Sequence, residues 1–253
     1  MGRCTAAMHS TLASDAEHEA FAPEPFTPHY VRGLFQSMRT LATHNLRLLR
    51  RQLKILPAGL TPMAERVLAL ESEIIARYRP LFERPLNAKR IRIHGDYHLD
   101  QILWTGKDFV ILDFEGDPAL SLSERCLKRS PLRDVAGMIR SFDYAAHEGL
   151  RQHIERGSLP PENRTEFEPW VHFWNQAVSG AFLRSYLSAL APADLLPNSP
   201  EDLGVMLQAY LLNQAMHELG YDLLNRPAWL KVPLQGLLDL LDTGKPMEPG
   251  SGT

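Results

Sequence analysis

Cysteine is scarce in this sequence, and the shortage excludes two classes of protein. Cys4 and Cys126 are the only cysteines among 253 residues, and they lie far apart without metal-ligand spacing. A disulfide-stabilised secreted scaffold and a zinc finger are therefore excluded. The sequence also lacks an apolar run of membrane-spanning length and a leader pattern at its start. We accordingly expect a cytoplasmic protein with no membrane partner.

A strong charge of either sign is also missing. The chain has 27 lysine and arginine residues against 30 aspartate and glutamate residues, which gives a net charge of −3. The longest basic cluster, residues 47–54, has the spacing of a solvated helix face. We therefore expect no nucleic-acid partner, because such a partner calls for a basic surface.

Proline, in contrast, is frequent, and it marks where helices are expected to begin. Apolar residues recur at three- and four-residue spacing after each of four hydroxyl–proline pairs, which is typical of a capped, core-facing helix. These pairs are Thr27-Pro28, Thr61-Pro62, Ser130-Pro131 and Ser199-Pro200. Further helices are predicted over residues 167–190 and 201–224, with a short last one after Pro233.

A segment in the middle of the chain has the pattern of strands instead. Residues 90–93 alternate between arginine and isoleucine, and short apolar runs cover residues 101–104 and 109–112. Gly106, between the two runs, can adopt the positive φ that a tight turn needs. We predict one small hairpin in an otherwise helical chain, and no strand before residue 90.

Ionisable side chains gather around that hairpin. Residues 94–101 read HGDYHLDQ, and residues 113–117 read DFEGD. Phosphoryl transfer needs a carboxylate to accept the proton of the attacking hydroxyl. It also needs an amide oxygen and a second carboxylate to hold Mg²⁺ against the phosphates of ATP. Asp96, Gln101 and Asp113 match these three roles in type and spacing.

The histidines of the same loop leave alternatives open. His94 has a structural interpretation, in which it hydrogen-bonds backbone carbonyls behind the loop, while the role of His98 stays open. A rival hypothesis makes His94, Asp96 and His98 the ligands of a transition metal in a hydrolase. The remaining histidines are scattered without paired spacing, which favours phosphoryl transfer.

Three segments together resemble bacterial maltokinases, which share the aminoglycoside-phosphotransferase-like fold and often occur fused to trehalose synthase. They are residues 94–101, residues 113–118 (DFEGDP) and residues 128–144 (KRSPLRDVAGMIRSFDY). The likeness continues in residues 21–28 and 218–227. It implies an α+β, mostly helical fold: the carboxyl-terminal lobe of a protein-kinase-like enzyme over residues 1–242, with the catalytic hairpin at about 90–117 and a disordered tail at 243–253.

The resemblance also implies an activity and its residues. Asp96 would be the catalytic base, and Gln101 and Asp113 would be the magnesium ligands. His94, His98 and Glu115 would lie beside the bound ATP. The implied reaction is the phosphorylation of maltose, or a related glucoside, by ATP to give maltose 1-phosphate, a donor for α-glucan synthesis.

Several positions depart from the family pattern. Asp100 stands where glycine is expected and adds a negative charge near the magnesium ligands, Asp117 stands where glutamate is commoner, and Cys126 lies in a usually basic stretch. Residues 1–9 resemble the helix that follows the lobe junction, so the β-rich lobe that grips ATP is expected to be absent. The alternatives are therefore a truncated or split kinase that pairs with a separate lobe, the end of a trehalose synthase fusion, or a non-catalytic pseudokinase remnant.

Two further expectations concern residues outside the loops. Arg133 and Asp134 follow the Ser130-Pro131 pair and are predicted to brace the catalytic loop with charge-assisted hydrogen bonds. Aromatic residues could contact a sugar ring, but on a helix they are more often core. We expect Trp174 to be core, and leave open the roles of Trp170, Tyr221 and Trp229.

Overall fold

The computed structural model describes residues 1–242 and divides the chain into two compact units. The first contains Met1–Thr27 and Leu86–Leu207, and the second contains Pro28–Pro85 and the chain from Gln208 onward. The two loops with many ionisable side chains, residues 94–101 and 113–117, are called the ionisable loops below. Both belong to the first unit. The single lobe expected over residues 1–242 stays a prediction, and the tail expected at 243–253 lies outside the described residues.

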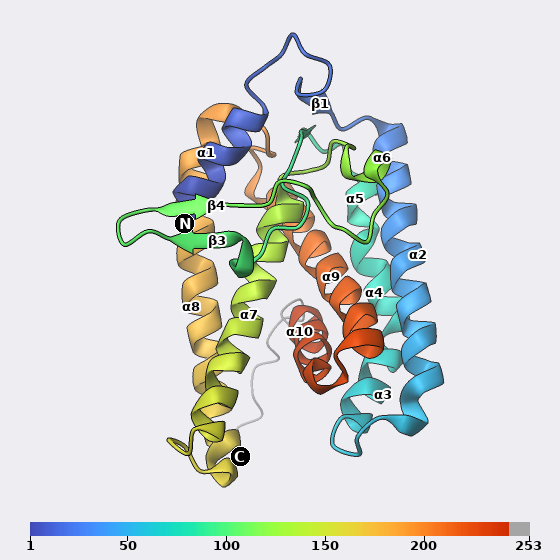
Figure 1. The fold of residues 1–253 in the computed structure, drawn as a ribbon. Coiled ribbons are helices and arrows are strands. Elements are labelled where there is room, and N and C mark those ends of the chain that lie inside the picture. Colours follow the sequence, from blue (N-terminus) through green and yellow to red (C-terminus); the bar gives the residue numbers. More distant parts are fainter. Residues whose placement is uncertain (243–253) are drawn as a thin grey trace, which may run out of the picture. The chain divides into compact units, whose positions relative to one another are not determined.

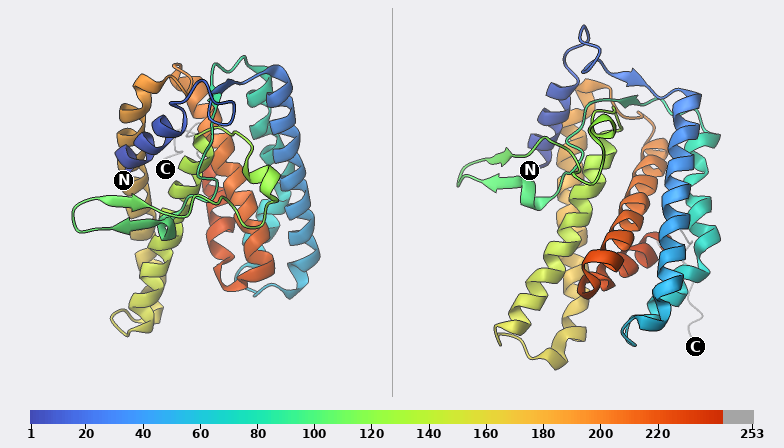
Figure 2. Two further views of the ribbon diagram at one scale, coloured as in Figure 1. Left: turned by 45° about the horizontal axis from the view of Figure 1, so that its top comes forward. Right: turned by 45° about the vertical axis from the view of Figure 1, so that its right-hand side comes forward.

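Helices make up most of the first unit (Figure 1). Its two long helices lie side by side, and the amino-terminal helix lies against one of them, α8, as Figure 2 also shows. The helices are α1 (Gly2–Leu12), α6 (Leu122–Arg125), α7 (Leu132–Glu155) and α8 (Arg164–Leu190). Short 3-10 turns are η2 (Leu99–Gln101), η3 (Pro161–Asn163) and η4 (Ala191–Ala193).

Only helices and 3-10 turns form the described part of the second unit. They are α2 (Pro28–Gln52), η1 (Leu53–Ile55), α3 (Thr61–Ala69), α4 (Glu71–Tyr78), α5 (Pro80–Glu83), η5 (Pro227–Trp229) and α10 (Lys231–Asp242). The division between the units falls inside α9 (Pro200–Asn225). α2 packs on α4 and α5 through an apolar stripe with helical spacing. The stripe consists of Val31, Phe35, Met38, Ala42, Leu46 and Leu49.

The prolines mark the helix starts to within two residues. α2 and α9 begin at Pro28 and Pro200, as predicted. Thr61 does not cap its helix, because it is already the first residue of α3. The stripe that follows Thr61 is shared between α3 and α4, which meet at Leu70. The last helix begins at Lys231, two residues before the expected proline.

The strands form two small antiparallel sheets. β3 (Ile102–Trp104) pairs with β4 (Phe109–Ile111), which confirms the predicted hairpin, and Gly106 in its turn has φ of 88°. The expectation of no strand before residue 90 is wrong, because β1 (Glu24–Pro25) pairs with β2 (Lys89–Arg90). Strands of two residues carry no apolar alternation that a sequence reader could detect.

Side-chain charges hold β1 in place. The ammonium group of Lys128, only 8% exposed, donates to Glu24 Oε1 and to the carbonyl of Ala22, both at 2.7 Å, and to the carbonyl of Glu19. Arg90 forms an ion pair with the same carboxylate. The hydrogen bond from Lys128 is the main cause that lowers the pKa of Glu24; desolvation opposes it and Arg90 adds to it. Lys128 thus anchors residues 19–24, which follow α1, by hydrogen bonds.

Trp174 is 45% exposed, so its assignment to the core is wrong. The buried residues of α8 are Phe182, Tyr186 and Leu190, all in its second half. α1 covers that half so closely that a Cβ added at Gly2 would lie 2.5 Å from the carbonyl oxygen of Phe182. Trp174 lies before the part of α8 that α1 covers. Helical spacing alone cannot show where along a helix such a cover ends.

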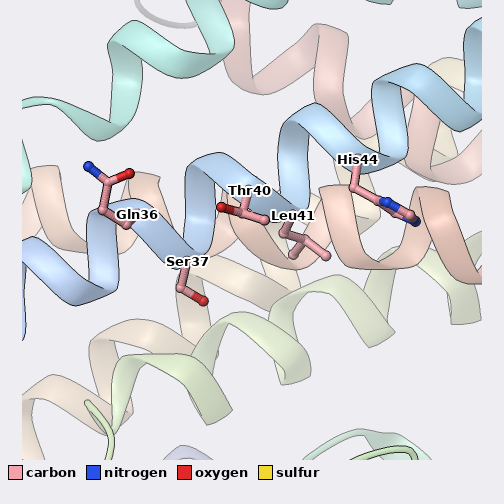
Figure 3. Close-up of a pocket in the computed structure, with 5 residues that line it drawn as sticks. All are labelled: Gln36, Ser37, Thr40, Leu41 and His44. Carbon is pink, nitrogen blue, oxygen red and sulfur yellow. The ribbon is translucent and has the colours of Figure 1, made fainter.

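A hollow of about 500 Å³ lies along α2 in the second unit (Figure 3). It is lined by Gln36, Ser37, Thr40, Leu41 and His44. All five belong to one helix, so the hollow is an open surface groove, and it contains no residue of the two ionisable loops. None of the helices within residues 1–242 is both long and apolar enough to cross a membrane.

Candidate active site

The ionisable loops are attached to the helices through a short backbone bridge. Ile91, which is fully buried, exchanges two backbone hydrogen bonds with Arg129, at 2.8 and 2.9 Å. The chain then runs without regular structure from residue 92 to η2, and the hairpin follows directly. The first loop (residues 94–101) therefore lies between the bridge and β3, and the second loop (residues 113–117) follows β4.

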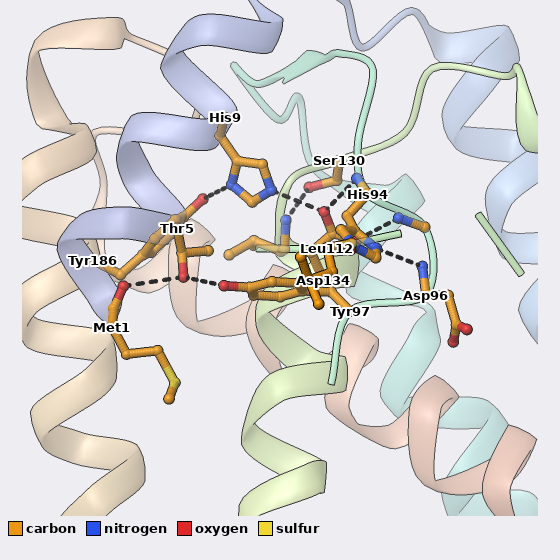
Figure 4. Close-up of polar contacts among 12 residues, drawn as sticks. Met1, Thr5, His9, His94, Asp96, Tyr97, Leu112, Ser130, Asp134 and Tyr186 are labelled. Carbon is orange, nitrogen blue, oxygen red and sulfur yellow. Dashed lines mark hydrogen bonds and ion pairs between the residues drawn. The ribbon is translucent and has the colours of Figure 1, made fainter. Parts of the chain in front are cut away.

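His94 fastens the two loops to each other (Figure 4). Its ring is 1% exposed, its Nε2 lies 2.7 Å from the carbonyl oxygen of Leu112, and its Nδ1 lies 3.3 Å from the amide nitrogen of Asp96. Both bonds form together when Nε2 carries the proton and Nδ1 accepts. The predicted bond to a backbone carbonyl is confirmed. With both nitrogens engaged, His94 cannot ligate a metal, which argues against the hydrolase hypothesis.

Asp134, in the first turn of α7, holds the first loop by its backbone. Its carboxylate accepts hydrogen bonds from the amides of His94 at 2.8 Å and Gly95 at 2.9 Å, and from Nε2 of His9 at 2.9 Å. Burial raises the pKa of Asp134, but the hydrogen bonds from His9 and from the two amides outweigh it and leave the pKa lowered. The prediction that Asp134 braces the loop is confirmed.

Arg133 does not share this role. Within residues 1–242, the side chain of Arg133 makes no hydrogen bond to the first loop. The reason is its position on α7, where Asp134 occupies the buried side and Arg133 stays partly exposed. Arg133 instead helps to line a small depression with Gly95, Gly116 and Arg125.

Asp96 is accessible at the surface of the loop, with its side chain 36% exposed. Its Oδ1 lies 3.7 Å from Nε2 of His98, and Nδ1 of His98 lies 3.6 Å from Oδ2 of Asp100. These separations exceed hydrogen-bond length, so the contacts of His98 with the two carboxylates are ion pairs only when its ring is protonated. The side chain of Asp100 is 94% exposed. Solvent therefore screens the extra negative charge of Asp100.

Gln101 and Asp113 flank the base of the hairpin, one just before β3 and the other shortly after β4. Gln101 ends η2, and its carbonyl accepts a 2.9 Å hydrogen bond from the amide of Leu112, the residue before Asp113. Asp113 has φ of 59°, the left-handed conformation that most side chains avoid. Strain of this kind is often found at functional sites, and here it turns the chain out of the strand.

The two loops also touch at their glycines. A Cβ on Gly95 would lie 3.4 Å from Cα of Gly116, and Gly116 itself has φ of 76°. Arg125 supports the second loop by donating to the carbonyls of Leu120 at 2.9 Å and Pro118 at 3.0 Å. Glu115 lies exposed on the second loop, next to this contact. The structure thus brings the loop of Asp96 and Gln101 together with the loop of Asp113 and Glu115.

The side-chain oxygens near the hairpin base are of the kinds that Mg²⁺ prefers. Magnesium in phosphotransferases is held by one or two carboxylates or amide oxygens together with the phosphates of the substrate. Gln101 and Asp113 supply one oxygen of each kind. Among residues 1–242 there is no group of three or more His, Cys, Asp or Glu side chains arranged for a metal. A site that relies on substrate phosphates does not need one.

Sequence reasoning missed the residues that support the loop from behind. They are Thr5, whose Oγ1 lies 2.8 Å from the hydroxyl of Tyr97, Ser141, whose Oγ accepts from the amide of Leu99 at 3.3 Å, and His9, Tyr186 and Gly137. Burial raises the pKa of Tyr97 to about 12. These contacts join residues at least 40 positions apart, and no local pattern reveals them.

The sequence is similar to known phosphotransferases. Residues 1–170 match the model of the phosphotransferase enzyme family. The chain is 29% identical over 153 residues to a glucosamine kinase of Streptacidiphilus jiangxiensis. The aligned residues make up 60% of this chain and 32% of that protein. It is 29% identical over 152 residues to a glucosamine kinase of Mycolicibacterium smegmatis (strain ATCC 700084 / mc(2)155), which covers 60% of this chain and 34% of that protein.

Solved structures agree with the sequence matches. A glucosamine kinase in complex with glucosamine, ADP and inorganic phosphate is 27% identical and superimposes with a TM-score of 0.75, over 96% of this chain and 53% of that one. A second crystal form gives a TM-score of 0.73 over 95% of this chain and 52% of that one. The predicted mostly helical, kinase-like fold is confirmed. The chain spans about a third of the curated relatives and about half of the solved chains.

Proposed function

Because this chain belongs to the phosphotransferase enzyme family, we propose that it carries the catalytic loop and metal ligands of a sugar kinase. The reaction would move the terminal phosphoryl group of ATP to a hydroxyl group of a sugar. The observation that carries the proposal is the fixation of the first loop. Asp134 and His94 hold its backbone in the interior, while the carboxylate of Asp96 stays accessible.

Each polar residue then has a definite task. Asp96 accepts the proton of the attacking hydroxyl, a contribution that is typically worth about 10²–10⁴-fold in rate. Gln101 and Asp113 would hold Mg²⁺, which neutralises charge on the phosphates when it is bound. His98 lies between the carboxylates of Asp96 and Asp100 and keeps the two negative charges apart. Glu115 faces solvent on the second loop, where it can accept a hydrogen bond from the sugar or from a metal-bound water.

Two sugars are candidates for the acceptor. Maltose follows from the resemblance to maltokinases, and glucosamine follows from the names of the relatives. The two differ in charge, because glucosamine carries an amine that can be protonated and maltose is neutral. A cationic acceptor would be attracted by the exposed carboxylates of the loops, and salt would screen that attraction.

Isothermal titration tests the proposal. Maltose, glucosamine and Mg²⁺-ATP would each be titrated separately into the chain at low and at high salt, with Asp113→Ala and Asp96→Asn as variants. We expect one sugar to bind the wild-type chain. Asp113→Ala should leave the binding of neutral maltose unchanged and weaken that of cationic glucosamine, because it removes one of the exposed carboxylates. Salt-sensitive binding of glucosamine identifies the cationic acceptor, and salt-insensitive binding of maltose identifies the neutral one.

The titration with Mg²⁺-ATP tests whether the chain binds nucleotide without a β-rich lobe. No β-rich lobe is found within residues 1–242, so we expect Mg²⁺-ATP to bind weakly, and the rate of phosphoryl transfer by the chain alone to be low. If neither sugar binds, the sugar-kinase assignment fails, and the interpretation as a non-catalytic remnant takes its place.

A further inference from the structure

Three buried side chains from three helices form a line behind the catalytic loop (Figure 4). His9 of α1 lies between them: its Nε2 is 2.9 Å from Oδ2 of Asp134 on α7, and its Nδ1 is 2.9 Å from the hydroxyl of Tyr186 on α8. His9 and Tyr186 are fully buried, and Asp134 is 1% exposed. None of the three can reach substrate, so their polar contacts need another explanation.

The atom that carries each proton in this line follows from which groups can donate a hydrogen bond and which can only accept one. The carboxylate of Asp134 only accepts, so Nε2 of His9 must carry a proton. Burial raises the pKa of Tyr186 well above its usual range, and the nearby charges of Asp134 and Tyr97 act in the same direction, so the hydroxyl keeps its proton. It can donate to Nδ1 of a neutral ring, which leaves the ring proton on Nε2.

The two oxygens of Asp134 are used unequally. Oδ2 accepts both from His9 and from the amide of His94, whereas Oδ1 accepts from the amide of Gly95. A carboxylate that lost the bond from His9 would be a buried charge with fewer donors, free to rotate or to take up a proton. Either change would loosen the amides of His94 and Gly95, and Asp96 follows Gly95 directly.

We propose that His9, oriented by Tyr186, is a positioning residue that keeps the carboxylate of Asp134 directed at the catalytic loop and so holds Asp96 in place. The inference rests on the proposed function, because it matters for catalysis only if Asp96 is the base. The first helix, α1, thereby affects the position of Asp96 through buried contacts and not through contacts at the surface of the site.

A pair of substitutions separates this role from simple packing. In His9→Gln the side-chain amide nitrogen falls near the position of Nε2, so it can still donate to Asp134. In His9→Asn the amide nitrogen falls near the position of Nδ1, so Asp134 loses its donor. Both variants are smaller than histidine and polar. Asparagine is also one methylene shorter than glutamine and leaves the larger cavity. A packing role would therefore loosen Gly95 and the neighbouring core of α8 together, whereas a positioning role would loosen Gly95 alone, and only in His9→Asn.

The readout is amide hydrogen exchange of Gly95 measured by NMR, compared with the amide of Phe182 in the core of α8. We expect exchange at Gly95, relative to Phe182, to rise at least about tenfold in His9→Asn and to stay within about threefold of wild type in His9→Gln. Equal behaviour of the two variants, or an unchanged Gly95 in both, overturns the proposal. The measurement uses no sugar or nucleotide, so failure of the sugar-kinase assignment cannot be mistaken for failure of this inference.

Tyr186→Phe gives a second test in case the histidine variants fail to fold. It removes one hydroxyl and leaves the ring in place, so Nδ1 loses its donor and the ring proton is no longer directed to Nε2. We expect exchange at Gly95 to rise by about threefold or more while exchange at Phe182 stays unchanged. If the amide of Gly95 exchanges as in wild type, orientation by Tyr186 is wrong.

Discussion

Asp134 is the residue on which most of the site's internal contacts converge. It is buried and negative, and its three donors come from α1 and from the catalytic loop. A buried charge is tolerated only when hydrogen bonds replace its water, and here the replacement also positions Asp96. The same group thus contributes to folding stability and to the position of the loop that carries Asp96.

Replacing Asp134 by asparagine should destabilise the chain strongly at neutral pH. Asparagine keeps one acceptor oxygen, but it presents an NH₂ group to one of the amides and removes the charge that faces His9. We expect a loss of about 3 kcal/mol in the free energy of unfolding at pH 7, measured by urea denaturation. A loss below about 1 kcal/mol would contradict the bracing role.

The difference between wild type and Asp134→Asn should also depend on pH. The pKa of Asp134 is lowered in the folded chain from an ordinary value of 3.8. The stability that it contributes is therefore complete above pH 3.8 and is lost as pH falls through the lowered pKa. Urea denaturation down to the lowest pH at which both proteins fold should show the gap narrowing only below pH 3.8. A gap that already narrows between pH 7 and pH 5 would contradict the assignment of this pH dependence to Asp134.

At the scale of elements, α7 and the catalytic loop approach each other through a glycine. A Cβ added at Gly137 would lie 2.7 Å from the carbonyl oxygen of Tyr97, closer than real Cβ contacts allow. Gly137→Ala should therefore push the loop off the helix and cost about 1–3 kcal/mol in the free energy of unfolding. It should also raise exchange at the amide of Gly95, because that residue lies on the displaced segment.

The same helix offers a matched control. Gly149 also lies within α7, but an added Cβ there meets nothing within 4 Å. Gly149→Ala should raise the free energy of unfolding by up to about 1 kcal/mol, since alanine favours helix over glycine. Opposite signs for the two substitutions in urea denaturation support the close approach at Gly137. Two changes of the same sign would contradict it.

Elements with a local signal could be predicted, and those without one could not. The helices from Pro28 and Pro200 and the hairpin around Gly106 have capping, spacing and turn residues that need no distant partner. β1 and β2 are held by Glu24, Arg90 and Lys128, whose contacts form only after folding. The catalytic loop shows the same division: its own residues were predicted, whereas His9, more than 80 residues earlier, was not.

At the scale of the whole chain, the hairpin carries apolar side chains on both faces. Leu103 and Val110 pair on one face and are 53% and 44% exposed, and Trp104 packs on Phe109 on the other and is 59% exposed. An isolated two-stranded ribbon with exposed apolar faces and open edges tends to associate. A separate lobe or a trehalose synthase domain, which the sequence led us to expect as a partner, could cover such a surface.

Without such a partner, the chain should associate with itself through the hairpin. Sedimentation velocity should show an average sedimentation coefficient that rises with protein concentration. The double substitution Leu103→Lys and Val110→Lys puts two charges on one face and should weaken association about tenfold or more, because burying unpaired charges is costly. Leu122→Lys with Leu127→Lys is a control with the same charge change at two exposed leucines on and after α6. Equal weakening by both pairs would mean that net charge, and not the hairpin surface, governs association.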